Sequence, residues 1–528
     1  MVYCGVFVSL AVFAQAVLAT RFKVIAPSAK GPDSVMVSVE GRTFRLNIQD
    51  PDVPYFTGDV NFSGNILTYK ASVYIVDGKA EAFERDMIGD STRNDFFNRP
   101  ITYADIPKLP TVIGDNDWDR AIPPGPIWDT NYIPTVFING DSDEMENLIT
   151  GLSKDIYFVK LTMIDADDVH TFQNAEFQLH KPGKTHNNAK QSWKWKLPEG
   201  QQLNGRDFFK IRHMEEDPTQ IREKLYADIL RAMGTPANQA NMIRFFINGE
   251  GMGTFNMLDD IPNYSYIEAN FYGGSAARMG PLFDGASGAS FRLTADSIEA
   301  FLPAPESSDN KDLLRELGSA LSLFDPRNEN DIAELDKHFN IDQFLRYMVM
   351  EYLTAHWDGY WQEQTNVGAY EDVDNQKVYF LAQDFDATFG ININRPREFL
   401  SVPYTDYPDL FPGGFLINSF LTNDRLRATF EEYLVKTVTT LFNPDVLGAH
   451  VLAYHDFILP DLKWDRRIVQ RSPGINYDWS FEHCTENLYS GVEGNNPTHG
   501  GGADWGLLEY IEAKSKVVAR QFRLRGRL

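Results

Sequence analysis

Two kinds of hydrophobic pattern divide the chain. Residues 20–108 alternate apolar and polar positions in short runs, such as FKVIA, SVMVSVEG, TFRLNI and NILTYKASVYIV, which Gly, Pro, Asn and Asp separate. Such runs are typical of half-buried β-strands, so this region is predicted to be a small all-β, sandwich-like domain. Residues 109–134 are rich in Pro and Asp and are predicted to be a linker. From 135 to 528 strand and helix patterns mix, and the predicted fold class is α+β.

A strand with two lysines is predicted in the second region. Its sequence, KQSWKWKL (190–197), alternates apolar and polar positions. One face would carry Trp193, Trp195 and Leu197, and the other Lys194 and Lys196. The predicted strand therefore presents both ammonium groups on the face that does not enter the core.

A helix is predicted directly after this strand, over residues 217–234. Asp217 is an N-cap residue, Gln220 completes a capping box, and Gly234 ends the helix. One apolar stripe recurs at every fourth position, at Ile221, Leu225, Ile229 and Met233. Glu223 lies in the first turn, where it could pair with Lys194 or Lys196.

Two hairpins and a second helix follow. Asn248-Gly249 is a strong signal for the first hairpin, and FLRYMVMEYLTA (344–355) has the periodicity of a buried helix. That helix leads into HWDGYWQEQTN (356–366). A second predicted hairpin then ends at QDFDATFG (383–390). These two polar segments therefore lie at the two ends of one hairpin.

The residues in these two segments are suited to phosphoryl transfer, which requires oxygen ligands for cations and a base beside the acceptor hydroxyl. Asp384 and Asp386 project in a similar direction and could hold a metal ion, with Asn366 as a neutral ligand. Asp358 is the candidate base. The alternative is that Asp358-Gly359 is a turn and that the two later acids lie at a solvated strand end.

The order of elements is typical of a protein-kinase fold: lysine strand, helix with a glutamate, hairpin, helix, polar loop, hairpin and acid pair. The local signatures depart from that fold, since the loop reads HWD and no G-x-G-x-x-G precedes the lysine strand. VYFLAQDFDAT also fits the D-x-D-x-T nucleophile motif of haloacid-dehalogenase phosphatases. Strand–helix alternation after Asp384 is not visible, which disfavours that alternative. HKPGKTHNN (180–188) is not a P-loop, because Gln178 stands where the first glycine would be.

The formal charge of −25 excludes nucleic acid and anionic membranes as favoured partners, because both attract clustered basic residues. The first nineteen residues are uncharged and almost wholly apolar, and Val17-Leu18-Ala19 resembles a cleavage site. They are predicted to be a signal peptide, with no further membrane anchor and no GPI tail. Asn61 and Asn263 begin N-glycosylation sequons, which suits a secreted protein.

Long motifs of this sequence resemble the CotH kinase family, most closely its fungal branch of surface invasins. They are HNNAKQSWKWKL, FFKIRHMEEDPTQIREKLYADILRAMG, INGEGMGTFNMLDDI, GPLFDGASGA, DGYWQEQTNVGAYEDVDNQ, QDFDATFG and SPGINYDWSFE. The resemblance spans nearly the whole chain and implies an atypical kinase-like domain over 135–528. It also implies a secreted or surface protein that phosphorylates protein serine or threonine with ATP and Mg²⁺ or Mn²⁺.

The resemblance also implies roles for particular residues. Asp358 corresponds to the catalytic aspartate, and the metal-binding set is Asn366, Asp384 and Asp386. Lys194, Lys196 and Glu223 would contact the nucleotide or orient the lysine that does.

The fungal branch further suggests a host-cell receptor as a partner, bound through residues 361–376. The candidate receptor-binding residues there are Gln364, Thr365, Gly368, Tyr370 and Glu371. Glu371 stands where the invasin pattern has an arginine. A surface adhesin that has lost catalysis is therefore the alternative function.

Overall fold

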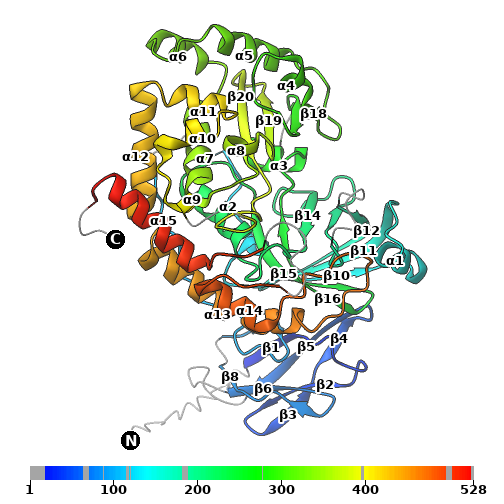
Figure 1. Ribbon diagram of the computed structural model, residues 1–528. Coiled ribbons are helices and arrows are strands. Elements are labelled where there is room, and N and C mark those ends of the chain that lie inside the picture. The colour runs from blue at the N-terminus through cyan, green and yellow to red at the C-terminus, as the bar shows by residue number, and fades with distance from the viewer. Residues whose placement is uncertain are drawn as a thin grey trace, which may run out of the picture. The chain divides into compact units, whose positions relative to one another are not determined.

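The computed structural model describes residues 18–62, 71–86, 89–113, 118, 120–180, 188–275, 278–393, 398–494 and 502–524 (Figure 1). The chain divides into two compact units. The first extends to Tyr103 and includes residues 166–168, and the second contains the rest of the chain. The predicted signal peptide, residues 1–19, lies outside the described residues except for its last two positions, and so does most of HKPGKTHNN.

The first unit contains two small sheets whose inner faces share one core, as the alternating pattern predicts. One sheet has the order β4-β5-β1-β9, and the other β3-β2-β6-β7, with β8 beside β6. Phe22, Val37, Phe56 and Tyr74 are among the core residues. The strands are β1 (Leu18–Ile25), β2 (Val35–Val39), β3 (Arg42–Arg45), β4 (Asn47–Asp50), β5 (Val53–Phe62), β6 (Ala71–Val76), β7 (Lys79–Ala80), β8 (Arg85–Asp86) and β9 (Asp95–Phe96). This region is therefore all-β, as predicted.

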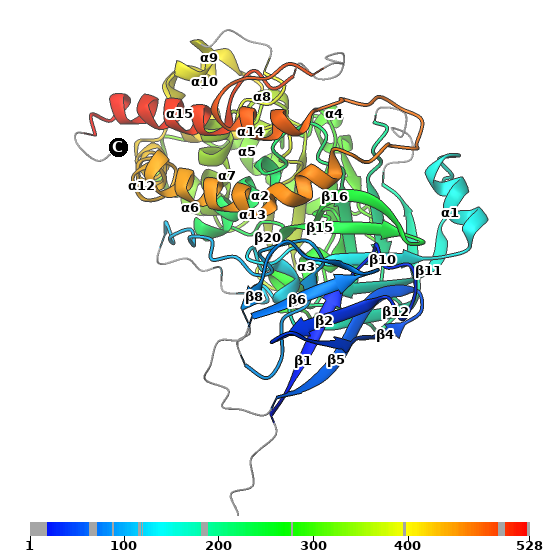
Figure 2. The ribbon, with the colours of Figure 1, turned by 90° about the horizontal axis from the view of Figure 1, so that it is seen from below.

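The second unit begins with a closed barrel in the order β10-β11-β12-β13-β14-β16-β15, which a parallel β10–β15 pairing completes (Figure 2). The strands are β10 (Thr135–Asn139), β11 (Tyr157–Ile164), β12 (Val169–Leu179), β13 (Trp193–Lys196), β14 (Phe208–Arg212), β15 (Ala240–Ile247) and β16 (Glu250–Leu258). Trp193, Trp195, Phe209 and Ile211 fill the interior. β13 confirms the predicted strand with its tryptophans inward. Asn248 and Gly249, at φ 48° and 80°, form the predicted β15–β16 turn.

Helix α2 (Arg222–Ala232) starts later than the capping pattern predicts. Residues 217–221 form a turn instead, in which Gln220 has φ 56°. Asp217 still binds the start of the helix, because its carboxylate accepts hydrogen bonds from the amides of Ile221 (2.8 Å) and Arg222 (2.9 Å). Gln220 makes no capping box, since its side-chain amide donates to Asp465. Gly234, at φ 68°, follows the helix as predicted.

The predicted second helix is α7 (Ile341–Thr354), in which every residue except Asp342 is buried. It contacts α2, α12 and the sheet strand β20, so it is enclosed by protein on several sides (Figure 1). That sheet has the order β18-β17-β19-β20. Its strands are β17 (Leu282–Gly285), β18 (Phe301–Pro303), β19 (Val367–Asp372) and β20 (Lys377–Ala382). The β19–β20 pair confirms the second predicted hairpin.

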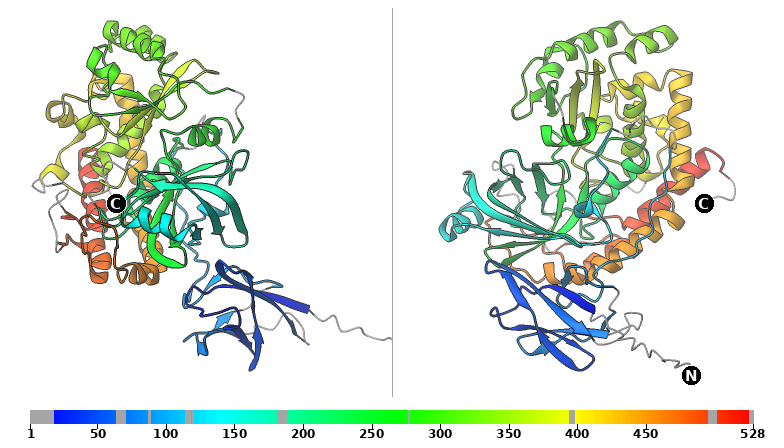
Figure 3. Two further views of the ribbon diagram at one scale, coloured as in Figure 1. Left: turned by 90° about the vertical axis from the view of Figure 1, so that its right-hand side faces the viewer. Right: turned by 180° about the vertical axis from the view of Figure 1, so that it is seen from behind.

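The remaining helices contact the barrel as well as α7 and this sheet, and Figure 3 shows the later ones in yellow to red. They are α1 (Ser142–Ile149), α3 (Tyr264–Phe271), α4 (Ala295–Glu299), α5 (Asp312–Leu323), α6 (Glu329–Leu335), α8 (Tyr360–Glu363), α9 (Glu398–Ser401), α10 (Tyr407–Leu410), α11 (Phe415–Phe420), α12 (Asp424–Thr440), α13 (Ala449–Asp465), α14 (Phe481–Tyr489) and α15 (Leu507–Gln521). Short 3₁₀ turns lie at Pro126–Trp128 and Tyr404–Asp406, and a π-turn at Pro444–Gly448.

The stretch predicted as a linker, residues 109–134, belongs to the second unit. Val112, Ile113 and Ile133 are buried in the core around α7, and Ile127 and Trp128 in that of the barrel. The described part of this stretch therefore packs into the second unit and does not form a separate connection between two domains. Among the described residues, none of the helices has both the length and the apolar character needed to cross a bilayer.

Candidate functional site

Asp358 lies in the loop that follows α7. The helix ends at Ala355, whose φ of 45° turns the chain away from the helix axis. The Asn366 side-chain amide donates to the Asp358 backbone oxygen (3.0 Å) and to its Oδ2 (2.9 Å). Asn366 directly precedes β19, so these bonds connect the loop to the start of the hairpin. The structure therefore brings together two of the residues that the sequence assigned to the site.

His356 connects Asp358 to the second acidic segment. Its Nε2 lies 3.1 Å from the Asp384 backbone oxygen and 3.4 Å from Asp358 Oδ1. The ring is buried, which acts to lower its pKa, but the hydrogen bond and charge of Asp358 outweigh this and raise the pKa of His356. The histidine thus fixes the distance between the ends of the hairpin.

Glu351, in the last turn of α7, binds the backbone of the same loop. Its carboxylate accepts hydrogen bonds from the amides of Tyr360 (2.9 Å) and Trp361 (2.7 Å). A Cβ on Gly359 would lie only 2.9 Å from His356 Nδ1 and 3.0 Å from Glu351 Oε1, so glycine alone fits between them. Burial raises the pKa of Glu351 to about 7, although His356 and the two amides oppose that shift.

Arg212, on β14, is the cation at the centre of the acidic residues. One of its nitrogens, Nη2, lies 2.8 Å from Asp384 Oδ1 and also pairs with Asp386 Oδ2. Its Nε lies 3.8 Å from Glu223 Oε1. Burial acts to lower the pKa of Arg212, but these three carboxylates raise it well above its ordinary value. Burial, together with Asp384 and Glu223, raises the pKa of Asp386 despite the guanidinium.

The backbone and an aromatic contact hold the acidic segment in place. Asp384 has a φ of 62°, an uncommon conformation for a residue with a side chain. Phe385, between the two acids, stacks on Tyr226 of α2 with ring centroids 4.1 Å apart. Both observations indicate that packing against α2 imposes this arrangement, since strained backbone persists only where its surroundings determine it.

Glu223 does not pair with either lysine of β13, contrary to the sequence-based expectation. It is buried on α2, where it accepts a hydrogen bond from Asn256 (2.9 Å) and faces Arg212. Lys196 instead pairs with the exposed Glu306 at 3.1 Å. The Lys194 ammonium lies 5.9 Å from the ring centre of Phe208.

Lys194 nevertheless shares a face with two cations of β14. It lies directly opposite Lys210 in the β13–β14 ladder, and Arg212 follows two positions later. Directly opposed residues of antiparallel strands project from the same side, here the side away from the barrel interior. Lys210 is buried, with its Nζ 4.0 Å from Asp260 Oδ1. Lys210 therefore already has a carboxylate close by, and Lys194 is a second cation opposite it on this face.

The arrangement suits a cation bound between Asp384 and Asp386. One oxygen from each meets the same guanidinium nitrogen, so the two carboxylates converge on one positively charged position. Carboxylate and amide oxygens are also the ligands that Mg²⁺ prefers. In the part of the chain that the structure describes, no three His, Cys, Asp or Glu side chains are already grouped as a metal cage. A metal ion held by both acids would therefore share or take the place of Arg212.

The candidate receptor-binding residues lie mostly inside the protein. Gly368, Tyr370 and Glu371 belong to β19, which is buried along its length between β17 and β20. Glu371 is 7% exposed, and Tyr370 is fully buried with its hydroxyl 2.6 Å from that of Tyr272. Gln364 and Thr365, before the strand, are half-buried. A partner approaching residues 361–376 would meet the flanking positions, not the strand itself.

Four residues of the site were not identified from the sequence: Arg212, Lys210, His356 and Glu351. The strand β14, FFKIR, is short and mostly apolar, so its sequence pattern does not reveal which of its side chains face α2. His356 lies two residues before Asp358, and this proximity in the sequence was an available signal. The partner of Glu351 is the backbone of a loop, which no side-chain pattern reports.

Comparisons with known proteins identify relatives of this chain. A family model described as "CotH kinase protein" matches residues 180–484. The chain is 53% identical over 503 residues to Invasin CotH7 of Rhizopus delemar, covering 94% of this chain and 83% of that protein. It is 52% identical over 500 residues to Spore coat protein homolog 1 of the same organism, with 94% and 81% covered. It is 22% identical over 258 residues to Inner spore coat protein H of Bacillus subtilis, with 47% and 67% covered.

Proposed function

Because the chain belongs to the CotH kinase protein family, we propose that it is an atypical protein kinase that transfers phosphate from ATP to serine or threonine of a protein substrate. One observation carries the proposal: a continuous set of contacts runs from Asp358 through His356 to Asp384, and from there through Arg212 to Asp386 and Glu223. A candidate base and a cation-binding carboxylate pair are thereby held in one rigid arrangement, as positioning-based phosphoryl transfer requires.

Asp358 would act as the base that accepts the proton of the substrate hydroxyl. Its Oδ2 accepts a hydrogen bond from Asn366, and its Oδ1 lies 3.4 Å from Nε2 of the buried His356. These two contacts hold the carboxylate in a fixed orientation. A base aligned in this way contributes on the order of 10² to 10⁴ in rate.

Asp384, Asp386 and Asn366 would hold Mg²⁺ or Mn²⁺. The bound metal would neutralise charge on the nucleotide phosphates during transfer. Arg212 keeps the two carboxylates close together before the metal and nucleotide arrive, because it offsets their mutual repulsion. Glu223 in turn keeps Arg212 directed toward the acids.

Lys194 and Lys210 would bind the nucleotide phosphates. They project from the same face of the barrel as Arg212, and their mutual repulsion would be relieved by an anion between them. Lys196 lies on that face but already pairs with Glu306 near solvent, so it would contribute little.

We further propose that the protein acts outside the cell. The names of its relatives, invasin and spore coat protein homolog, indicate a cell-surface setting for those proteins. Residues 1–19 have the composition of a secretory signal peptide. A second candidate function is a surface adhesin that contacts host cells, which the name Invasin CotH7 favours.

Incubation of the purified protein with γ-labelled ATP, Mn²⁺ or Mg²⁺ and an acceptor protein tests the proposal. The wild type and Asp358→Ala are compared with Asp374→Ala, a control in the exposed turn of the β19–β20 hairpin. We expect incorporation to fall by at least about 100-fold in Asp358→Ala and to be unchanged in the control.

Equal incorporation in Asp358→Ala and wild type would contradict the catalytic assignment. Absence of incorporation in all three, together with host-cell binding that Glu363→Arg abolishes, would instead support the adhesin. Glu363 suits that test because it is exposed within residues 361–376.

A further inference from the structure

Arg212 lies at the point where the two carboxylates proposed to hold a metal ion converge. Its Nη2 is 2.8 Å from Asp384 Oδ1 and also contacts Asp386 Oδ2. Mg²⁺ lies about 2.0 to 2.1 Å from its oxygen ligands, so an ion bound by both of these oxygens would lie close to the position of this nitrogen. The metal ion and the guanidinium nitrogen therefore exclude each other from this position.

The charges around Arg212 indicate which of its contacts would change. Asp384, Asp386 and Glu223 carry three negative charges when ionised, against the single positive charge of the guanidinium. A divalent ion added to this set would make it neutral if Arg212 stayed beside Glu223. The Arg212 Nε lies 3.8 Å from Glu223 Oε1, and this contact can persist while Nη2 leaves the two aspartates.

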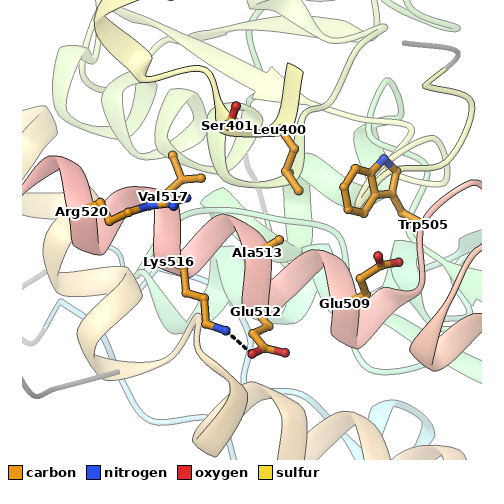
Figure 4. Close-up of a pocket in the computed structure, with 9 residues that line it drawn as sticks. All are labelled: Leu400, Ser401, Trp505, Glu509, Glu512, Ala513, Lys516, Val517 and Arg520. Carbon is orange, nitrogen blue, oxygen red and sulfur yellow. Dashed lines mark hydrogen bonds and ion pairs between the residues drawn. The ribbon is translucent and has the colours of Figure 1, made fainter. Parts of the chain in front are cut away.

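The segment that carries both aspartates is fixed by packing near its start and at its end. Phe385 stacks on Tyr226 with ring centroids 4.1 Å apart. At the other end, a Cβ on Gly390 would lie 2.6 Å from Trp505 Cβ, so no space separates them. Figure 4 shows Trp505 at one end of a groove beside α15, and its backbone oxygen accepts a hydrogen bond from the buried Arg222 (2.9 Å). The carboxylates are therefore held in place, and the guanidinium is the group that would have to move.

The guanidinium of Arg212 is held less firmly than the acids, and a second binding place lies near it. Within the described residues its side chain makes a single hydrogen bond, to Asp386, because Nε has no such partner there. Lys210 precedes Arg212 by two residues on β14, about 7 Å along the strand, and Lys194 lies opposite Lys210. Phosphates bound to these lysines would lie within reach of Arg212, whose planar fork suits a phosphate.

We propose that Arg212 keeps a divalent cation out of the site until a nucleotide arrives, and then exchanges Asp384 and Asp386 for the nucleotide phosphates. Glu223 is the anchor about which the guanidinium turns. The proposal rests on the metal and nucleotide assignments of the function proposed above, and it adds the order of binding. The nucleotide frees the two acids first, and the acids then take up the metal ion.

Binding of Mn²⁺ in the absence of nucleotide gives the first test, with the free ion measured by electron paramagnetic resonance. We expect Arg212→Met to bind Mn²⁺ at least about tenfold more tightly than the wild type, because the competing cation is gone. Arg212→Lys keeps the charge without the planar fork and should have an intermediate affinity. Arg425→Met removes the same charge from an exposed ion pair with Glu329 (2.8 Å) and is the matched control, with wild-type affinity.

Binding of a non-hydrolysable ATP analogue at saturating Mn²⁺ gives the second test, by calorimetry. Arg212→Met should bind the analogue about tenfold more weakly than the wild type, because it lacks the phosphate contact. The two effects have opposite signs, whereas a purely structural role for Arg212 would weaken both kinds of binding. Circular dichroism checks that each variant is folded, and Arg212→Lys provides the comparison if Arg212→Met is not.

An affinity for Mn²⁺ that is equal to or below that of the wild type in the folded Arg212 variants would overturn the proposal. Unchanged binding of the analogue in these variants would also overturn it. A wild type that transfers no phosphate, in a series where the two opposite effects are observed, would contradict the kinase function and support the role of Arg212 in binding.

Discussion

Strands β13 and β14 are neighbours in the barrel, and each carries two basic residues, yet their cations have different surroundings. Lys196 of β13 is near solvent and pairs with one exposed glutamate. Arg212 of β14 is almost wholly buried and faces three carboxylates. The difference arises because Arg212 faces Glu223 of α2 and the acids of residues 383–390, whereas Lys196 faces Glu306 near solvent. Alternation within a strand therefore identifies the polar face, but the packing partner decides what a cation on that face does.

Replacement of the cations themselves gives the largest expected difference. Arg212→Ala would leave Asp384, Asp386 and Glu223 without their cation, so the free energy of unfolding should fall by about 3 kcal/mol or more. Lys196→Ala removes a surface ion pair and should cost at most about 0.5 kcal/mol. Urea denaturation measures both values. Equal losses in the two variants would contradict the distinction between the strands.

The affinity for ATP is a second way to compare the basic residues of β13 and β14, with a smaller expected change in free energy. Lys194→Ala and Lys210→Ala should each weaken binding of ATP with Mn²⁺ by about tenfold, because each would remove a charge-assisted contact to phosphate. Lys196→Ala, on the same strand as Lys194 but turned to solvent, serves as the control and should bind as the wild type does. Titration calorimetry gives the dissociation constants. If only Lys196→Ala bound the nucleotide more weakly, the proposed roles of Lys194 and Lys210 in phosphate binding would be contradicted.

A third prediction is a pH dependence that originates at Glu351. Its folded-state pKa of about 7 lies above its ordinary value of 4.5, so the folded protein retains a proton that the unfolded chain has lost between these values. Its contribution to stability is therefore complete below pH 4.5 and is lost as the pH rises through 7. Glu351→Gln should remove this loss, which amounts to at most about 1.4 kcal/mol per pH unit. Urea denaturation at several pH values from 5 to 8 compares the two proteins, and identical slopes would contradict the assignment.

Sequence patterns predicted which acidic residues lie close together better than they predicted the basic residues beside them, for a physical reason. Asp358, Asn366, Asp384 and Asp386 flank one hairpin, so local chain geometry alone brings their segments together. The partners of Glu223 come from β14 and β16, and only the tertiary packing of α2 on the barrel selects Arg212 over Lys194 and Lys196. The start of α2 was misplaced for a similar reason. Asp217 caps the helix from within a buried turn, which its position before Ile221 does not reveal.

Binding and catalysis should separate between the two ends of the hairpin, and this tests the central claim most directly. Calorimetric titration of Mn²⁺ with a non-hydrolysable ATP analogue is compared for wild type, Asp358→Ala and Asp384→Ala. We expect Asp358→Ala to bind the metal–nucleotide complex with wild-type affinity and Asp384→Ala to bind at least about tenfold more weakly, because only the second variant would lose a proposed metal ligand. Wild-type affinity in Asp384→Ala would contradict the account.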